Sequence, residues 1–118
     1  MSDSDGSAPL REFRLVVERR PEYVGLAGEA ATLICEGLGL GEPARLAIGD
    51  ATTDALAVLD TTGEVEVSLR IVDGQLEIEL RGGSLPADPA SDPRLARARA
   101  AVDSIAARQS ALVLRKKL

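Results

Sequence analysis

A chain of 118 residues with 45% hydrophobic content has enough apolar material for one core and too little for two. Aromatic residues make up only 2%, and the formal charge is −5 at pH 7, so neither base stacking nor phosphate attraction favours nucleic acid as a partner. The chain has no histidine, which excludes histidine-based general base catalysis and Ser-His triads. Its single cysteine, Cys35, lies in an apolar helical pattern and is interpreted as an unreactive core thiol.

The first residues differ in composition from the remainder of the chain. Residues 1–9 are acidic, rich in serine and poor in apolar side chains, which predicts a disordered tail and neither a signal peptide nor a membrane anchor. We therefore expect a cytoplasmic protein with a single domain over residues 10–118 that does not engage a membrane.

The first ordered elements are a strand and two helices. Apolar and polar residues alternate from Phe13 to Val17, which predicts a strand that ends before Pro21. Helices are then expected over residues 21–38 and from Glu42 to about Leu59, with glycines between them. We expect the buried stripe of the first helix to consist of Leu26, Ala30, Leu33, Ile34 and Gly37.

The second half of the chain predicts a hairpin, a helix and a last strand. Strict alternation over residues 64–71 and 76–81 flanks Asp73-Gly74, a type I′ turn signal that joins antiparallel strands. After a loop over residues 81–93, a third helix is expected with a buried stripe of Leu95, Ala98, Val102 and Ile105. The segment from Ser110 to Arg115 predicts the last strand.

These elements define the expected architecture. Their order is β-α-α-β-β-α-β, and both the sheet and the helices have one apolar side to bury. The sequence therefore predicts an α+β fold, a two-layer α/β sandwich with the helices on one face of the sheet.

Several short segments of the chain match a known family in the same order. They are Arg20-Pro21-Glu22-Tyr23-Val24 at the first strand-to-helix turn, the alanine-containing run 47–55, and Ala101-Val102-Asp103 before a last strand with a basic end. Together they resemble the anti-sigma-factor serine kinases of the histidine-kinase-like ATPase (GHKL, Bergerat-fold) superfamily. The resemblance spans nearly all of the ordered chain and implies a Bergerat-like fold with a mixed, mainly antiparallel sheet.

The resemblance assigns chemistry to two acidic positions. Where the family has a Glu that acts as base and an Asn that holds magnesium against the nucleotide, this chain has Asp50 and Asp54. The resemblance thus implies Asp50 as the catalytic residue of an active kinase and Asp54 as the magnesium and nucleotide ligand. The two carboxylates, four residues apart, share one helix face, and a solvated polar face is the alternative interpretation.

The remaining nucleotide motifs are altered in this chain. Gly82 and Gly83 match the glycines of the family's adenine-binding loop and are candidate cofactor contacts, or simply a turn. Arg81 stands where the family has Asp, and a guanidinium cannot accept a hydrogen bond from adenine. The glycine-rich lid is replaced by residues 90–94, in which Asp92 and Pro93 are better interpreted as a helix N-cap and first turn.

The altered motifs favour a binding function over catalysis. We expect a regulatory protein-binding domain that resembles an anti-sigma factor, binds no cofactor and associates with a sigma factor or an anti-sigma antagonist, with a homodimer as a further expectation. The alternative is an active ATP-dependent serine kinase that uses Asp50, Asp54 and magnesium. A third interpretation is an interaction domain whose partner is unrelated to transcription.

Charged residues at two places are candidates for the partner interface. The alternative interpretation of the arginines is an ordinary solvated helix face. The candidates are Arg19, Arg20 and Glu22 at the first turn, and Arg94, Arg97 and Arg99 on the last helix.

Overall fold

The described strands form one sheet in the order β2-β3-β4-β6-β5, and every neighbouring pair is antiparallel. The computed structural model describes residues 12–60 and 63–118, so the tail predicted at residues 1–9 lies outside the described residues. The strands are β2 (Glu12–Glu18), β3 (Glu64–Val72), β4 (Gln75–Arg81), β5 (Ser104–Arg108) and β6 (Ala111–Lys117).

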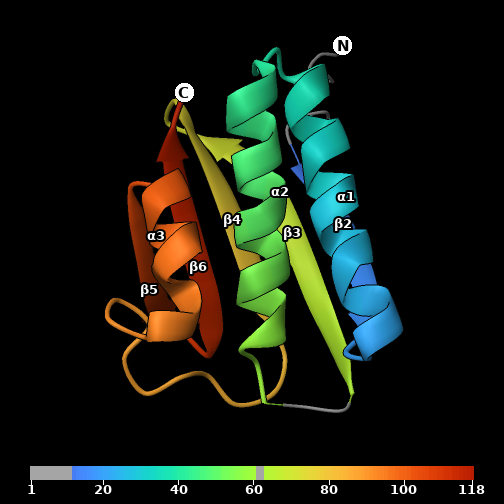
Figure 1. The fold of residues 1–118 in the computed structure, drawn as a ribbon, viewed down its shortest axis with the longest axis vertical. Coiled ribbons are helices and arrows are strands. Elements are labelled where there is room, and N and C mark those ends of the chain that lie inside the picture. The colour runs from blue at the N-terminus through green and yellow to red at the C-terminus, as the bar shows by residue number, and fades with distance from the viewer. Residues whose placement is uncertain (1–11, 61–62) are drawn as a thin grey trace, which may run out of the picture.

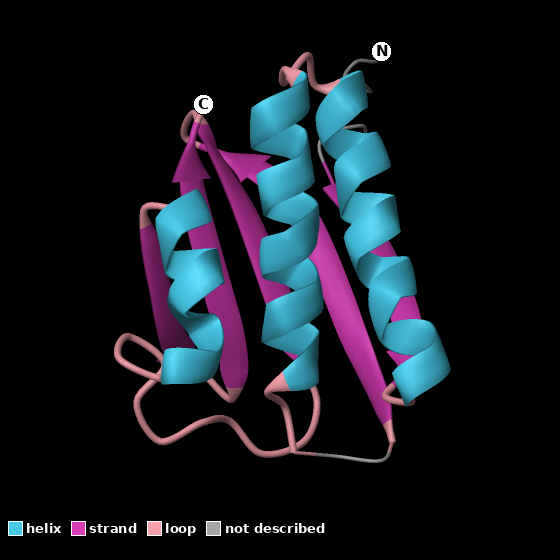
Figure 2. Ribbon diagram, viewed as in Figure 1, coloured by secondary structure: helices cyan, strands magenta, loops and turns pink. Residues whose placement is uncertain are grey.

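The helices cover one face of this sheet, as Figures 1 and 2 show. They are α1 (Pro21–Gly37), α2 (Glu42–Ala57) and α3 (Ala96–Ala101), the last preceded by a 3-10 turn at Pro93–Leu95. The predicted α+β class, the order of the predicted elements and the helices on one face are confirmed, and the structure adds a strand, β5, between the third helix and the last strand. The mixed sheet is a wrong expectation for the described strands, which are antiparallel throughout.

The sheet has one apolar and one charged face because its strands alternate with period two. The apolar face lies under the helices and consists of buried side chains such as Val67, Ile78 and Leu114. The predicted type I′ turn is confirmed, since Asp73 and Gly74 both have positive φ, of 53° and 76°.

The buried face of α1 differs from the predicted stripe. Leu26 and Leu33 are 50% and 67% exposed, and the residues that α1 buries are small: Ala27, Gly28, Ala31 and Cys35. A hydrophobic pattern gives most weight to the largest apolar side chains, whereas close packing of two helices selects the smallest. Cys35 is a buried core thiol, as predicted, and burial raises its pKa to about 11.

Two glycines allow α1 and α2 to approach closely. A Cβ atom on Gly28 would lie 2.6 Å from the carbonyl oxygen of Gly49, and against the hydroxyl of Thr53. A Cβ atom on Gly49 would in turn lie 2.9 Å from the carbonyl oxygen of Gly28 and against the hydroxyl of Thr32. The two helix backbones are therefore in near contact at this point.

The third helix is shorter than predicted. It ends at Ala101, and Val102 is extended with φ −127° and ψ 167°. The chain continues as β5, in which Ile105 lies opposite Leu114 of β6. Ile105 is buried, as expected, but from a strand, because pairing with β6 overrides the helical preference of the alanines around it.

The close approach of the helices generates the first prediction. Gly28→Ala is expected to destabilise the fold by about 1–3 kcal/mol, because the new methyl group meets backbone of α2. Gly25→Ala is the matched control: it lies in the same helix with nothing within 4 Å of its added Cβ and is expected to stabilise by about 0.5–1 kcal/mol. Denaturant unfolding of both variants measures the difference, and equal effects would contradict the packing described here.

Candidate functional site

The two acidic residues assigned by the resemblance lie on the side of α2 that meets α3. Arg97 of α3 donates to both carboxylate oxygens of Asp54, with Nε to Oδ2 at 2.9 Å and Nη2 to Oδ1 at 2.7 Å. Its Nη1 lies 3.7 Å from Oδ2 of Asp50. The structure thus brings three predicted site residues together, Asp50, Asp54 and Arg97. Arg97 is predicted to bind a protein partner, whereas the two aspartates are predicted to serve catalysis and metal binding.

The geometry of this cluster is that of a bidentate ion pair between two helices. The side chain of Asp54 is only 18% exposed, whereas those of Arg97 and Asp50 are 61% and 56% exposed. The hydrogen bonds to Asp54 raise the pKa of the Arg97 guanidinium above its ordinary value. Among residues 12–60 and 63–118, no group of three or more His, Cys, Asp or Glu side chains could hold a metal ion.

The predicted glycine pair occupies a tight turn after β4. Gly82 and Gly83 have positive φ of 146° and 71°, and a Cβ on Gly82 would lie 2.7 Å from the carbonyl oxygen of Glu64. The backbone therefore requires glycine at position 82, whereas the φ of Gly83 lies in the left-handed region that glycine favours. The preceding Arg81 donates to the carbonyl oxygen of Gln109 at 2.5 Å and to Glu79 at 3.3 Å.

The segment that replaces the family's lid is held by its own hydrogen bonds. Asp92 caps the 3-10 turn by accepting from the backbone N–H of Arg94 at 2.9 Å, as predicted for an N-cap. The Arg94 side chain also binds both oxygens of Asp92, and these contacts lower the pKa of that carboxyl to about 2. Arg99 donates to the carbonyl oxygen of Asp92 at 2.6 Å.

The arginine at the first turn caps α2. Arg19 donates to the carbonyl oxygens of Leu56 at 3.3 Å and Ala57 at 2.5 Å, which the end of a helix leaves without intrahelical partners. Arg19 and Arg94 line one open hollow of about 500 Å³ beside Asp60.

The six predicted partner-binding residues therefore divide into two groups. Arg19, Arg94, Arg97 and Arg99 are engaged within the chain by the contacts given above. Arg20 and Glu22 are exposed, and the only ion pair found for Arg20 within the described residues is with Glu18 at 3.6 Å.

A buried carboxylate on the charged face of the sheet was not predicted from the sequence. Glu77 is 5% exposed and accepts hydrogen bonds from Arg70 at 2.7 Å and Arg115 at 2.9 Å. Arg108 forms an ion pair with the same carboxylate, at 3.6 Å. Burial alone would raise its pKa, but the hydrogen bonds from Arg115 and Arg70 outweigh it and the net pKa is lowered. The hairpin register offered a signal, since the predicted turn places Arg70 opposite Glu77.

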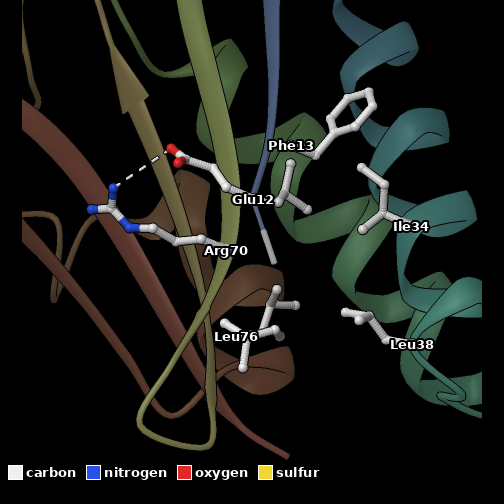
Figure 3. Close-up of a pocket in the computed structure, with 8 residues that line it drawn as sticks. Glu12, Phe13, Ile34, Leu38, Arg70 and Leu76 are labelled. Atoms are coloured by element: carbon white, nitrogen blue, oxygen red, sulfur yellow. Dashed lines mark ion pairs between the residues drawn. The ribbon is translucent and has the colours of Figure 1, made fainter. Parts of the chain in front are cut away.

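A second hollow lies between α1 and one end of the sheet. Figure 3 shows Phe13, Ile34 and Leu38 on one side of the strands, with the Glu12–Arg70 ion pair on the other, where the charged atoms are 3.9 Å apart. The hollow holds only about 30 Å³, roughly the share of liquid volume of a single water molecule, and so it is not a ligand site.

The comparisons with known proteins add no relative. No family model matches the chain, and no curated protein matches its sequence. Within the described part of the chain, none of the helices combines the length and apolar character that crossing a bilayer requires.

The Glu77 cluster generates the second prediction. Glu77→Gln is expected to lower the unfolding free energy by about 1–2 kcal/mol at pH 7, because charged hydrogen bonds are lost while the partly exposed arginines remain hydrated. Because the folded pKa of Glu77 is depressed, its contribution is complete above the ordinary value of 4.5 and is lost as the pH falls below it. The difference between wild type and variant should therefore shrink in acid.

Denaturant titrations at several pH values measure this difference. Glu36→Gln, at an exposed position of α1, is the control and should change stability little at any pH. A Glu77→Gln effect that grows as the pH falls would contradict the assignment.

Proposed function

We propose that this chain is a regulatory protein-binding domain that resembles an anti-sigma factor and works without ATP or catalysis. The observation that carries the proposal is the commitment of both Asp54 oxygens to Arg97. In the family that the chain resembles, the position of Asp54 holds magnesium against the nucleotide phosphates.

The Arg97 pair disfavours a magnesium ion for two reasons. A cation at Asp54 needs carboxylate oxygens that are free to coordinate it, and here both accept charged hydrogen bonds. The guanidinium also supplies positive charge at the same point, so an added cation would be repelled. Arg97 thus supplies beside Asp54 the positive charge that magnesium supplies in the family the chain resembles.

The rest of the nucleotide region supports the same conclusion. Arg81, in place of the adenine-binding Asp, is held by a backbone carbonyl on the β5–β6 turn. Hydrogen bonds of Asp92 with Arg94 and Arg99 hold the segment that replaces the lid. The carboxylate of Asp92 also places a negative charge where the family uses the backbone amides of glycines. Each of these contacts is local and needs no ligand to complete it.

Exposed apolar side chains support association with a protein. Exposed apolar groups that gather in one region of a surface commonly mark interaction sites. On β2 and α1, the exposed Val16, Tyr23 and Leu26 line one hollow. Phe13 and Leu33 are further exposed apolar side chains on the same two elements. That the partner is a sigma factor or an anti-sigma antagonist follows from the family resemblance of the ordered segments.

The third prediction concerns nucleotide binding. Thermal unfolding with and without ATP and magnesium is expected to give the same midpoint, whereas a ligand at about 100 times its Kd would add about 2.7 kcal/mol and raise the midpoint by several degrees. Arg97→Ala removes the guanidinium that contacts Asp54 and Asp50. Arg108→Ala is the matched control, because Arg108 lies on β5 and pairs with Glu77 instead of the aspartates. A shift in the wild type that Asp54→Ala abolishes would overturn the proposal and favour the kinase.

The partner is tested separately. Each sigma factor and anti-sigma antagonist of the same organism is co-expressed with the tagged chain, and the purified mixture is analysed by light scattering for a complex of defined stoichiometry. Complex formation that does not depend on ATP supports the proposal. Failure of every such protein to bind contradicts it.

A further inference from the structure

The exposed side of α1 carries a regular row of side chains that alternate between glutamate and leucine. They follow one another at steps of four and three residues, the spacing with which one helix presents a straight seam to a second helix. Each of them is exposed, and none belongs to the residues that α1 buries. We call this row the α1 seam, and its members are Glu22, Leu26, Glu29, Leu33 and Glu36.

The two leucines of the α1 seam lie largely outside the core. Leu26 is 50% exposed and Leu33 is 67% exposed. They are about 10 Å apart along the same side of the helix, because seven residues make nearly two full turns. Single exposed leucines need no explanation, but an apolar stripe that recurs on one side of a helix is typical of a face that packs against another element.

A hollow of about 350 Å³ adjoins the start of the α1 seam. Tyr23 and Leu26 line it from the helix, and Leu15 and Val17 line it from β2. Figure 1 shows α1 at one end of the helical layer, with α2 beside it. The hollow therefore offers an apolar side chain of a partner a place next to the leucines of the seam.

The glutamates of the α1 seam have no counter-charge within the part of the chain that the structure describes. None of Glu22, Glu29 and Glu36 forms an ion pair there, and the sequence of α1 contains no lysine or arginine. The arginine nearest to them along the chain, Arg20, pairs instead with Glu18 at 3.6 Å. Successive glutamates are also about 10 Å apart, so each can accept a separate cation.

Charge and pattern select one kind of occupant for the α1 seam. A row of carboxylates repels nucleic acid and anionic lipid surfaces, because both carry dense negative charge. A second copy of α1 would set glutamates against glutamates, and like charges at a helix–helix seam oppose pairing. The complementary surface is a helix on which large apolar residues alternate with lysine or arginine at the same spacing.

Among residues 12–60 and 63–118, no helix presents that pattern on an accessible surface. Arg94, Arg97 and Arg99 flank Leu95, but Leu95 is fully buried and Arg97 binds Asp54. Residues 1–11, which lie outside the described residues, contain one arginine and one leucine, too few to match the seam. The occupant that fits is therefore another protein.

We propose that the α1 seam is the docking face for an amphipathic helix of a partner protein, whose facing side alternates apolar and basic residues. The apolar side chains of that helix pack against Leu26 and Leu33, and its cations pair with the glutamates of the seam. This inference names the chemistry of the partner, so it rests on the proposed protein-binding function. It does not rest on the partner being a sigma factor.

Two synthetic helical peptides test the charge of the partner. One has leucine and arginine at alternating seam positions over about three heptads, and the other has glutamate in place of arginine. Fluorescence anisotropy with the full chain should show that the arginine peptide binds about tenfold more tightly or better, and that added salt weakens its binding. Equal affinity for the two peptides, or no binding of the arginine peptide, would overturn the proposal.

Substitutions show whether the peptide binds at the seam. Glu29→Lys combined with Glu36→Lys should reverse the preference between the peptides, whereas Glu66→Lys on the charged face of the sheet should leave it unchanged. Leu33→Ala should weaken the arginine peptide about tenfold with little change in stability, since Leu33 lies mostly outside the core. Val72→Ala, at an exposed position at the end of β3, is the apolar control. A preference that survives the two lysine substitutions would contradict docking at α1.

The proposed function is separated from this inference by one further measurement. Any sigma factor or antagonist that forms a complex with the wild type is mixed with the variant that carries both Glu29→Lys and Glu36→Lys. Equal binding to that variant would overturn the inference and leave the proposed function intact. Peptide binding at the seam without any such complex would contradict the anti-sigma assignment and leave the inference intact.

Discussion

The arrangement of the helices over the sheet follows from the close approach of α1 and α2. Gly28 and Gly49 bring the two backbones together, and that contact fixes the rotation of α2 about its own axis. With Gly49 and Thr53 turned toward α1, the next positions around the helix, Asp50 and Asp54, face α3. The contact of two glycines thus decides where the carboxylates point.

Because of that rotation, the residues of the candidate site connect α2 to α3. The short helix α3 is attached to α2 by the bidentate pair of Arg97 with Asp54, and the loop before it is closed by Asp92. On the other face of the sheet, Glu77 of β4 pairs with arginines from β3, β5 and β6, so that four strands are joined in the same way. Arginine–carboxylate pairs hold the protein on both sides of a core that has few aromatic side chains.

Much of the fold is predictable from local patterns, while the site depends on contacts between distant residues. The Asp73-Gly74 turn and the alternation around it identify the central hairpin because turn type and strand period are local properties. The buried face of α1 is not predictable in this way, since Leu26 outweighs glycine in any hydrophobic pattern. Asp54 and Arg97 are 43 residues apart, and nothing in either segment indicates that they meet.

We propose that Asp54 is committed to Arg97 and is not available to a magnesium ion. A double-mutant cycle tests it directly: unfolding free energies are measured for the wild type, Asp54→Asn, Arg97→Gln and the double variant. If Arg97 holds Asp54, the coupling free energy between the two side chains is favourable and decreases as salt is added, because the pair is partly exposed. A coupling of zero at low salt would show that the carboxylate is free to bind a cation.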